Sequence, residues 1–527
     1  MTRQEHRFDH EADVVVVGAG GAGLPAAIAA RDAGASVLVI DSNQDVGGHA
    51  IVSGGSVALG GGTALQRRYG IDDSPDRIYS DITDPHNPQY RRSDRDLARV
   101  FADESVPTFD WLLENGVAFE DQAPTPQTFG RGTVPRSMWT VLTSSDWSVT
   151  INGRRGAGVV RPLEMSARRK GVAFVLRHRL VRLLCEEGRV TGLVASAEGG
   201  DVAIGARQGI VIATGGHSSN VGFRRMFDPR LTDEYQTLGE PWTRQDADGE
   251  IAAMDVGASL WGLGSQATEQ EGESVSLALV RTTHIGCRWG YITLKWDPRS
   301  PVFSLARASG LTVSDLQDVI LVNQTGQRFW NELDETRAFI NACLGPNGDL
   351  GRDGKANGGG PIWAIFDSAA AEREQWTCEP PHVDPEDWFF SAGSIKELAR
   401  CIVNPHQRRP IDPSTLEATV ERWNLLVEAG DDVDFGRPTP SRRAAALARR
   451  IQTPPFYAAW ATPMVHDSLA GLRIDASCRV LDRAGDPIPG LYCAGESAGG
   501  LAVHGLPRAI IFGRVAGRAA ALSCPWP

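Results

Sequence analysis

The sequence predicts an α/β protein with a largely parallel sheet that is interrupted by an inserted α+β domain. An apolar run at residues 13–17 meets clustered glycines, which is typical of a buried strand that turns into a helix. Two later apolar runs, at 209–216 and 490–496, also end in glycines. From about 240 to 450 the periodicity weakens, and Trp, Pro and polar residues are mixed. We therefore expect the chain to leave the sheet, form a second domain and return.

The first glycine turn follows the strand directly and predicts a dinucleotide site. Gly18 permits a tight turn, Gly20 lets a pyrophosphate approach the backbone, and Gly23 lets the helix pack closely on the strand. The N-terminus of that helix offers N–H groups and partial positive charge to phosphates. The next strand, 36–40, ends in Asp41, which is placed to accept hydrogen bonds from a ribose. This order of elements predicts a Rossmann-like, dinucleotide-binding fold.

The remaining elements follow from local patterns. The glycine-rich segments 46–55 and 60–63 indicate backbone that passes close to a flat ligand. Apolar residues at helical spacing predict a helix from Asp94 to Asn115. Residues 158–215 predict a helix opened by Arg161-Pro162-Leu163, then a strand, a hairpin and a buried strand. A last helix is expected from Ala509 to Leu522.

Composition excludes several classes of protein. The 527 residues suffice for two or more domains, and the net charge of −12 argues against nucleic acid as a partner. No apolar run approaches the roughly 20 residues of a membrane span. The opening residues contain no hydrophobic signal region, so a cytoplasmic location is expected. The eight cysteines show no CxxC and no zinc-like spacing, which predicts reduced thiols and no metal site.

Four segments in this order, GAGGAG, VIDSNQDVGG, IATGG and GLYCAGE, resemble the FAD-dependent fumarate reductase and 3-ketosteroid Δ1-dehydrogenase superfamily. Asn323–Glu332 is similar to that superfamily's G-x-R-F-x-N-E stretch, and Thr453–Ala458 to its approach to the active site. The resemblance implies an FAD-binding domain split by a substrate-capping domain. It places the FAD-binding parts at 1–240 and 450–527 and the cap at 241–449.

The resemblance also implies the cofactor contacts. Thirteen residues are expected to contact the pyrophosphate, ribose, isoalloxazine, adenosine and ribityl parts of FAD. They are Gly18, Gly20, Gly23, Asp41, Gly47, Gly48, Ser53, Gly54, Gly55, Ala213, Thr214, Gly215 and Glu496. His49 lies where some relatives attach FAD covalently, but its spacing to Gly54 is one residue shorter and matches GG-x-x-x-x-SGG of ketosteroid dehydrogenases. Non-covalent FAD is therefore expected. No second strand–glycine–helix motif is evident, so NAD(P)H is not expected as a resident cofactor.

The active-site segments indicate the ketosteroid dehydrogenase-like branch. Fumarate reductases carry two adjacent histidines before TMGG, whereas this chain has His466 followed by Asp467. Fumarate reductases also carry a carboxylate-binding arginine ahead of a GGNA segment, and the corresponding segment here, 499–509, is shorter. Arg373 matches their proton-delivering arginine only approximately. The expected reaction is desaturation next to a carbonyl of a cyclic ketone or keto acid, by α-proton abstraction and β-hydride transfer to flavin N5, with an external electron acceptor.

Candidate catalytic residues follow from that chemistry. His504 with the Gly505 amide is the expected pair that polarises the carbonyl. Tyr457 and His466 are candidates for the base or for hydrogen bonding to substrate. Arg508 is a candidate clamp for a substrate carboxylate, or else it begins the last helix by pairing with an acid. An apolar pocket over the flavin, or alternatively a structural core, would use Trp242, Trp261, Trp289, Trp296 and Trp330.

Two alternatives stay open at this point. A flavin-dependent reductase of an α,β-unsaturated acid would run the same hydride transfer in reverse. A flavin-binding sensor or partner subunit, in which the catalytic loop has decayed, belongs to a different class. Bleaching of the flavin by substrate or by an external donor distinguishes oxidation from reduction.

Overall fold

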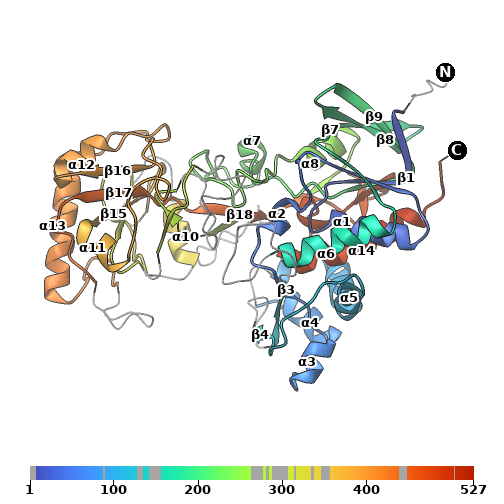
Figure 1. The fold of residues 1–527 in the computed structure, drawn as a ribbon, viewed down its shortest axis with the longest axis horizontal. Coiled ribbons are helices and arrows are strands. Elements are labelled where there is room, and N and C mark those ends of the chain that lie inside the picture. Colours follow the sequence, from blue (N-terminus) through green and yellow to red (C-terminus); the bar gives the residue numbers. More distant parts are fainter. Residues whose placement is uncertain are drawn as a thin grey trace.

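The structure is a computed structural model in which two bodies lie side by side along the long axis (Figure 1). One body contains the N-terminus, the C-terminus and the large sheet, and the other contains a smaller sheet with the helices α10 to α13. The described residues are 8–86, 90–126, 134–141, 156–262, 277–280, 284–287, 307–313, 316–333, 337–345, 356–437, 448–503 and 505–526.

The large sheet confirms the predicted Rossmann-like core. Its strand order is β20-β21-β9-β1-β2-β6, and β7 and β8 join through β9. β1, β2, β6, β9 and β21 run parallel, and β1 pairs with both β2 and β9, so the strand before the glycine turn lies at the centre. The bounds are β1 His10–Val17, β2 Val37–Asp41, β6 Ala173–Leu176, β7 Arg179–Glu186, β8 Arg189–Ala197, β9 Gly200–Ile212, β20 Arg479–Leu481 and β21 Pro487–Cys493.

Two helices pack on this sheet with their backbones in contact. A Cβ added to Gly513 of α14 (Gly505–Ala521) would lie 2.2 Å from the carbonyl oxygen of Ala22, just before α1 (Gly23–Asp32). A Cβ on Gly517 would lie 2.0 Å from the carbonyl oxygen of Ala26. The closing helix is therefore fixed against the helix that begins the dinucleotide motif. Further helices of this body are α2 Gly48–Ile51, α5 Arg95–Glu114, α6 Ala157–Arg169, α7 Val221–Arg224 and α8 Asp248–Asp255.

The predicted helices are present, with two earlier starts. α5 begins after Asp94, whose carboxylate caps the helix by accepting hydrogen bonds from the Asp96 and Leu97 N–H groups of the first turn. α6 begins at Ala157, so Pro162 lies inside the helix rather than at its start. The missing N–H there removes a single hydrogen bond of the second turn, and the buried face holds the helix in place. α14 begins at Gly505, four residues before the expected Ala509.

A small three-stranded sheet, β3-β5-β4, extends the first body. Arg136 is buried there and pairs with Asp73 at 2.8 Å and with Asp81 at 2.6 Å, which joins this sheet to the preceding helices. The bounds are β3 Ser56–Ala58, β4 Thr125–Pro126, β5 Pro135–Trp139, α3 Ala64–Arg68, α4 Pro75–Ile82 and the 3₁₀ turn η1 Tyr90–Arg92.

The second body is built on an antiparallel sheet of order β14-β15-β17-β16. Trp363 of β15 pairs with Trp460 of β17, and both indoles are buried. β17 belongs to this sheet, so the chain leaves the second body after Trp460, about ten residues later than the boundary expected at 450. The bounds are β14 Ile320–Val322, β15 Trp363–Asp367, β16 Phe389–Ala392, β17 Phe456–Trp460, α10 Arg337–Cys343, α11 Ser368–Arg373, α12 Ile395–Cys401 and α13 Pro413–Ala429.

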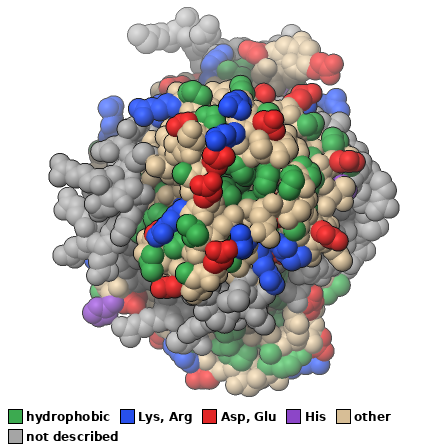
Figure 2. All heavy atoms as spheres, turned by 90° about the vertical axis from the view of Figure 1, so that its left-hand side faces the viewer, with side chains coloured by type: hydrophobic (Ala, Val, Ile, Leu, Met, Phe, Trp, Pro, Cys, Tyr) green, Lys and Arg blue, Asp and Glu red, His purple; other side chains and the backbone are tan. Residues whose placement is uncertain are grey.

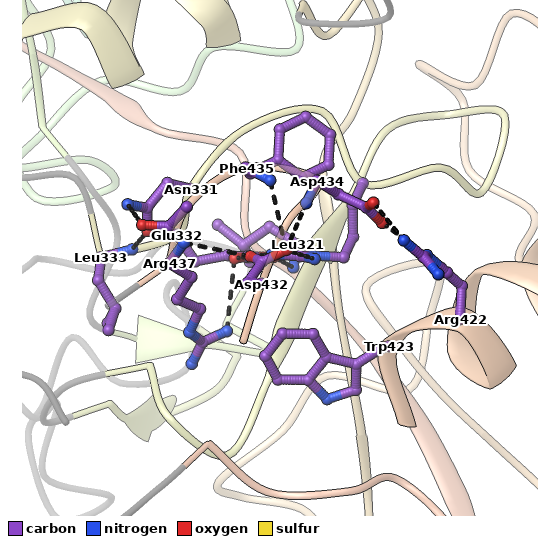
Figure 3. Close-up of polar contacts among 12 residues, drawn as sticks. Leu321, Asn331, Glu332, Leu333, Arg422, Trp423, Asp432, Asp434, Phe435 and Arg437 are labelled. Carbon is purple, nitrogen blue, oxygen red and sulfur yellow. Dashed lines mark hydrogen bonds and ion pairs between the residues drawn. The ribbon is translucent and has the colours of Figure 1, made fainter. Parts of the chain in front are cut away.

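The G-x-R-F-x-N-E stretch has a structural role in this second body (Figure 3). Arg328 and Glu332, both buried, pair at 2.7 Å, and Arg328 also contacts Asp432 at 2.9 Å. Arg437 approaches Glu332 from the other side at 3.4 Å. Both guanidinium groups lie over the ring of Trp423, at 4.6 and 4.8 Å from its centre. The motif therefore joins the turn after β14 to the loop after α13.

Short strand pairs complete the fold, and several lie between the two bodies. They are β10 Leu260–Trp261 with β19 Gly471–Leu472, β11 Leu277–Val280 with β18 Met464–Ser468, and β12 His284–Ile285 with β13 Leu311–Thr312. The 3₁₀ turn η2, Gly495–Ser497, follows β21. Figure 1 shows β18 on the path from the second body to the large sheet.

The outer face of the second body carries charges of both signs around apolar side chains (Figure 2). A binding site for a polyanion would need an extended region of positive charge, and the described part of this face has none. Among the described residues, no helix combines the length and hydrophobicity that a bilayer crossing requires. The cytoplasmic location expected from the sequence stays a prediction.

Candidate active site

A cavity of about 420 Å³ opens at the carboxyl ends of the parallel strands. Val17, Asp41 and Ala213 line it from the ends of β1, β2 and β9, and Gly495 lines it after β21. Ligands of open parallel sheets bind in this position, where the connections leave toward opposite sides. The cavity is therefore the candidate binding site.

The first glycine turn fits close backbone packing and leaves space for a ligand. Gly18 has φ +107°, and an added Cβ would lie 2.3 Å from the Ala213 oxygen. A Cβ on Gly23 would lie 1.7 Å from the Gly18 oxygen, so α1 contacts the turn directly. A Cβ on Gly20 would meet nothing closer than the Gly47 oxygen at 3.7 Å. A side chain at Gly18 or Gly23 would overlap protein atoms, so packing of the protein requires glycine at both positions. Gly20 has free space beside it, and that space belongs to the cavity.

Asp41 lines the cavity and is held by the backbone. One carboxylate oxygen accepts from the Ala19 N–H and the other from the Asn43 N–H, both at 2.7 Å. Burial raises the pKa of Asp41, and these two hydrogen bonds oppose the increase. The second lone pair of each oxygen is the acceptor that a ribose hydroxyl requires.

The second glycine segment faces the first across the gap. Gly48, His49 and Ser53 line the cavity. Gly47, with φ +122°, lies behind them, because an added Cβ would meet Ile51 at 2.6 Å. Of the expected contacts in this segment, Gly54 and Gly55 do not line the cavity; the Gly55 N–H is bound by the Ser53 hydroxyl at 3.3 Å.

The third wall comes from the turn after β9. Ala213, Thr214 and Gly215 line the cavity as expected. The Ser497 hydroxyl accepts from the Gly215 N–H at 3.1 Å and thereby joins this turn to η2. The walls from β9 and β21 are thus fixed to each other.

One rim of the cavity was missed by sequence reasoning. Asn43 donates from its side-chain amide to the Trp242 carbonyl at 2.8 Å. Arg179, at the start of β7, pairs with Asp248 at 2.8 Å, and Arg244 pairs with Asp246 at 3.0 Å. Arg179, Arg244, Asp246 and Asp248 lie in segments without a local motif, and only the fold brings them near Asp41. Of the tryptophans considered, Trp242 alone lines the cavity among described residues; Trp289 and Trp296 lie outside the described residues.

Glu496 is a half-buried carboxylate that lines the cavity. It accepts from the Ser468 N–H and from the Gln245 side-chain amide, each at 2.7 Å. Burial, together with the neighbouring charge of Asp467, raises the pKa of Glu496 well above its usual range, although Arg508 opposes the increase. A carboxyl group in this state can both donate to and accept from a ligand hydroxyl.

Two histidines meet at the cavity wall. His49 is half-buried, and its ring packs edge-to-face against that of His466, with centroids 6.4 Å apart. Burial lowers the pKa of His49 to about 4, so this imidazole is neutral at physiological pH. His466 on β18 has a side chain that is 30% exposed, and its Nδ1 lies 3.6 Å from the Asp467 carboxylate. The pair places two imidazole rings next to each other on the cavity wall.

Arg508 is at the cavity, but its guanidinium faces the backbone. Five carbonyl oxygens accept from it, those of Leu501, Val503, Ser468, Gly495 and Ala498, at 3.1 to 3.5 Å. Burial lowers the pKa of Arg508, and Glu496 and Asp467 oppose the decrease. Arg508 therefore organises the segment from Gly495 to Val503 around one cation.

The structure brings Gly505, His466 and Arg508 to one cavity. Gly505, with φ +77°, begins α14 there, so the positive end of a long helix faces the site. His504 lies outside the described residues. Tyr457 is not brought to the cavity: it lies in β17 and stacks on Phe366 with ring centroids 5.1 Å apart.

The residues present fit a bound dinucleotide. The gap at Gly20, the N-terminus of α1 and the Asp41 carboxylate match phosphates and a ribose. The Gln245 side-chain oxygen is buried at the cavity and lacks a hydrogen-bond partner among the described residues, which a ligand hydroxyl would supply. No group of three or more metal-ligating side chains occurs within the described part of the chain.

Comparisons with known proteins show the family of this chain and several similar proteins. Residues 13–254 and 301–508 match the model of a family described as FAD binding domain. The urocanate reductase of Eggerthella lenta is 27% identical over 524 residues, covering 97% of this chain and 75% of that protein. A fumarate reductase (cytochrome) of Shewanella frigidimarina is 28% identical over 518 residues, covering 97% and 77%. The solved 3-ketosteroid-Δ4-(5α)-dehydrogenase of Rhodococcus jostii has a TM-score of 0.59 and 25% identity, covering 98% of both chains.

Proposed function

Because the chain belongs to the FAD binding domain family, we propose that it uses bound FAD to reduce a C=C bond conjugated to a carbonyl or carboxyl group. Its relatives are FAD-dependent oxidoreductases of C=C and CH–CH bonds, and this class holds for the chain. The direction and the substrate are the proposal. Two relatives similar over nearly the whole chain are reductases of urocanate and of fumarate, which supports reduction over the desaturation expected from the sequence.

The observation that carries the proposal is the position of His466. Its partly exposed ring lies on the cavity wall, beside the neutral His49 ring and with the Asp467 carboxylate near its Nδ1. When bound, the flavin supplies or accepts a hydride. A conjugated substrate then needs a hydrogen bond on its carbonyl oxygen and a proton at the α-carbon. We assign His466 to hydrogen bonding or proton transfer at the substrate.

Arg508 is proposed as a positioning residue in place of the carboxylate clamp considered from the sequence. All five of its hydrogen bonds go to carbonyl oxygens of the protein. A substrate carboxylate would have to compete with these oxygens. The Gly505 amide and His504 stay candidates for polarising the carbonyl, and Tyr457 would need to approach from the second body.

Desaturation of a cyclic ketone or keto acid is the second candidate. It is favoured by the likeness to the ketosteroid dehydrogenase across both chains. In that direction His466 would receive the α-proton, and an external acceptor would take the electrons. FAD held without a covalent bond to His49, in either direction, is part of the same proposal.

The test is a pair of anaerobic half-reactions followed by flavin absorbance. Chemically reduced enzyme is mixed with urocanate, fumarate, acrylate or a cyclic enone, and oxidised enzyme with cyclic ketones, keto acids and 3-ketosteroids. Reoxidation by an unsaturated compound supports the reductase. Bleaching by a saturated ketone, with no reoxidation in the first experiment, replaces it with the desaturase. In His466→Ala the productive half-reaction should slow at least about 100-fold with FAD still bound.

A further inference from the structure

Two segments beside the cavity are joined to each other, the loop before α8, near 236–245, and the segment near 461–468 that returns from the second body. The Val465 N–H of β18 donates to the Gln236 carbonyl at 2.8 Å, and the Leu238 N–H donates back to the Val465 carbonyl at 2.9 Å. His466 follows this shared residue directly, so its position depends on both segments.

Both segments also hold the same carboxylate. Gln245 comes from the loop before α8 and Ser468 from the returning segment, and each donates to a different oxygen of Glu496 at 2.7 Å. Glu496 itself belongs to η2, which follows the large sheet. One carboxyl group of the cavity therefore connects η2 to both segments.

Gln245 has one polar atom left for a ligand. Its backbone is fixed by Ser219, which donates to the Gln245 carbonyl at 2.9 Å and accepts the Gln245 N–H on its hydroxyl at 3.0 Å. The side chain belongs to a residue that is 1% exposed, and its oxygen is buried without a hydrogen-bond partner among the described residues. Gln245 nonetheless lines the cavity, next to Gly215 and Glu496. A buried acceptor of this kind is costly unless a ligand donor reaches it.

We propose that Gln245 is an FAD-positioning residue that couples binding of the cofactor to the β18 segment, which returns from the second body. Its amide N–H orients Glu496, its amide oxygen accepts a hydrogen bond from a hydroxyl of the bound cofactor, and the same Glu496 fixes Ser468. Cofactor binding thereby orders the β18 segment that carries His466. The inference uses only the FAD site and does not depend on the direction of hydride transfer.

The first experiment measures FAD affinity of the apoprotein by fluorescence. Gln245→Met keeps the volume and removes both hydrogen bonds, so the Kd for FAD should rise about tenfold, as expected for one lost hydrogen bond with a charged or buried partner. Gln324→Met is the matched control. Gln324 is likewise buried, and its amide donates to the Gly359 carbonyl at 2.7 Å in the second body. The control should bind FAD as the parent does.

The second experiment tests the coupling by hydrogen exchange. FAD should slow exchange of the peptide that covers 464–469 in the parent protein, and this slowing should be largely lost in Gln245→Met at saturating FAD. If the Met variant does not fold, Gln245→Asn keeps the amide and shortens its reach, and the same two measurements apply. An unchanged Kd, an equal loss of affinity in Gln324→Met, or full slowing of 464–469 in the Gln245 variant would each overturn the proposal.

Discussion

Gly20 leaves room for the ligand, whereas Gly23 allows α1 to pack closely on the glycine turn. One alanine substitution at each position tests this difference. In Gly23→Ala the new Cβ would start 1.7 Å from the Gly18 oxygen. Ordinary contact needs about twice that separation, so α1 would have to move by more than about 1 Å and lose its packing on β1. We expect a loss of at least about 3 kcal/mol in the free energy of unfolding of the apoprotein.

Gly20→Ala should behave differently. The new Cβ meets no protein atom within 3.7 Å, so the stability of the apoprotein should change by less than about 1 kcal/mol. The methyl group narrows the gap between Gly20 and Gly48, where both line the cavity. Displacing a pyrophosphate there weakens one or two charge-assisted hydrogen bonds, so the Kd for FAD should rise about 10- to 100-fold.

The two variants are compared by denaturant unfolding of the apoproteins and by FAD titration. Gly199→Ala is a further control for the added methyl group alone, because Gly199, like Gly20 and Gly23, has no positive φ and nothing lies within 4 Å of an added Cβ. Parent-like FAD affinity in Gly20→Ala would refute the assignment of this gap to the cofactor. Parent-like stability in Gly23→Ala would refute the close packing of α1.

Three further results are expected. Glu332→Ala removes the shared partner of two buried arginines, and the free energy of unfolding in urea should fall by about 3–5 kcal/mol. Asp434→Ala, which removes the exposed ion pair with Arg422, should lower it by less than about 1 kcal/mol. Equal effects of the two variants would contradict the buried network. Burial alone would raise the pKa of Glu332, but Arg328 and Arg437 hold this pKa below the ordinary 4.5. The ionised Glu332 therefore contributes its full stabilisation above pH 4.5, and this contribution is lost as the pH falls further. When the urea midpoint of unfolding is measured against pH, its decline in acid should be smaller in Glu332→Gln than in the parent protein. Arg508→Met should lower both thermal stability and FAD content, and Arg508→Lys should restore part of each; full stability with weaker binding of acids alone would restore the clamp.

Local patterns predicted the elements of the large sheet well. The strand before Gly18, the acid at Asp41 and the helix after Asp94 each depend on neighbours in sequence, and the structure places all three as expected. The split fold and the FAD class are confirmed by the two matched segments of the family model. The starts of α6 and α14 were placed too late, because Pro162 and Gly505 are tolerated where tertiary packing holds the helix.

The parts that sequence reasoning missed depend on contacts between distant segments. Gln245 reaches Glu496 across 251 positions, and no spacing rule connects them. Arg508 was considered as a clamp because arginine suits carboxylates, yet the chain folds its own carbonyls around it. Tyr457 was placed near the site by motif position, but β17 pairs within the sheet of the second body. Local chemistry identified these side chains, and only the tertiary fold determines what they contact.

The cavity is built from two kinds of material, and this has a consequence for divergence. Around the glycine turn the seat is formed by main-chain atoms, so most side chains there are free to drift provided that Gly18, Gly20 and Gly23 persist. The wall at His49 and His466 is formed by side chains, and each replacement alters its chemistry. If the wall at His466 contacts substrate as we propose, related proteins can keep the same bound nucleotide while their substrates differ. Substitutions that accompany a change of substrate should then occur on β18 more often than in the glycine turn after β1.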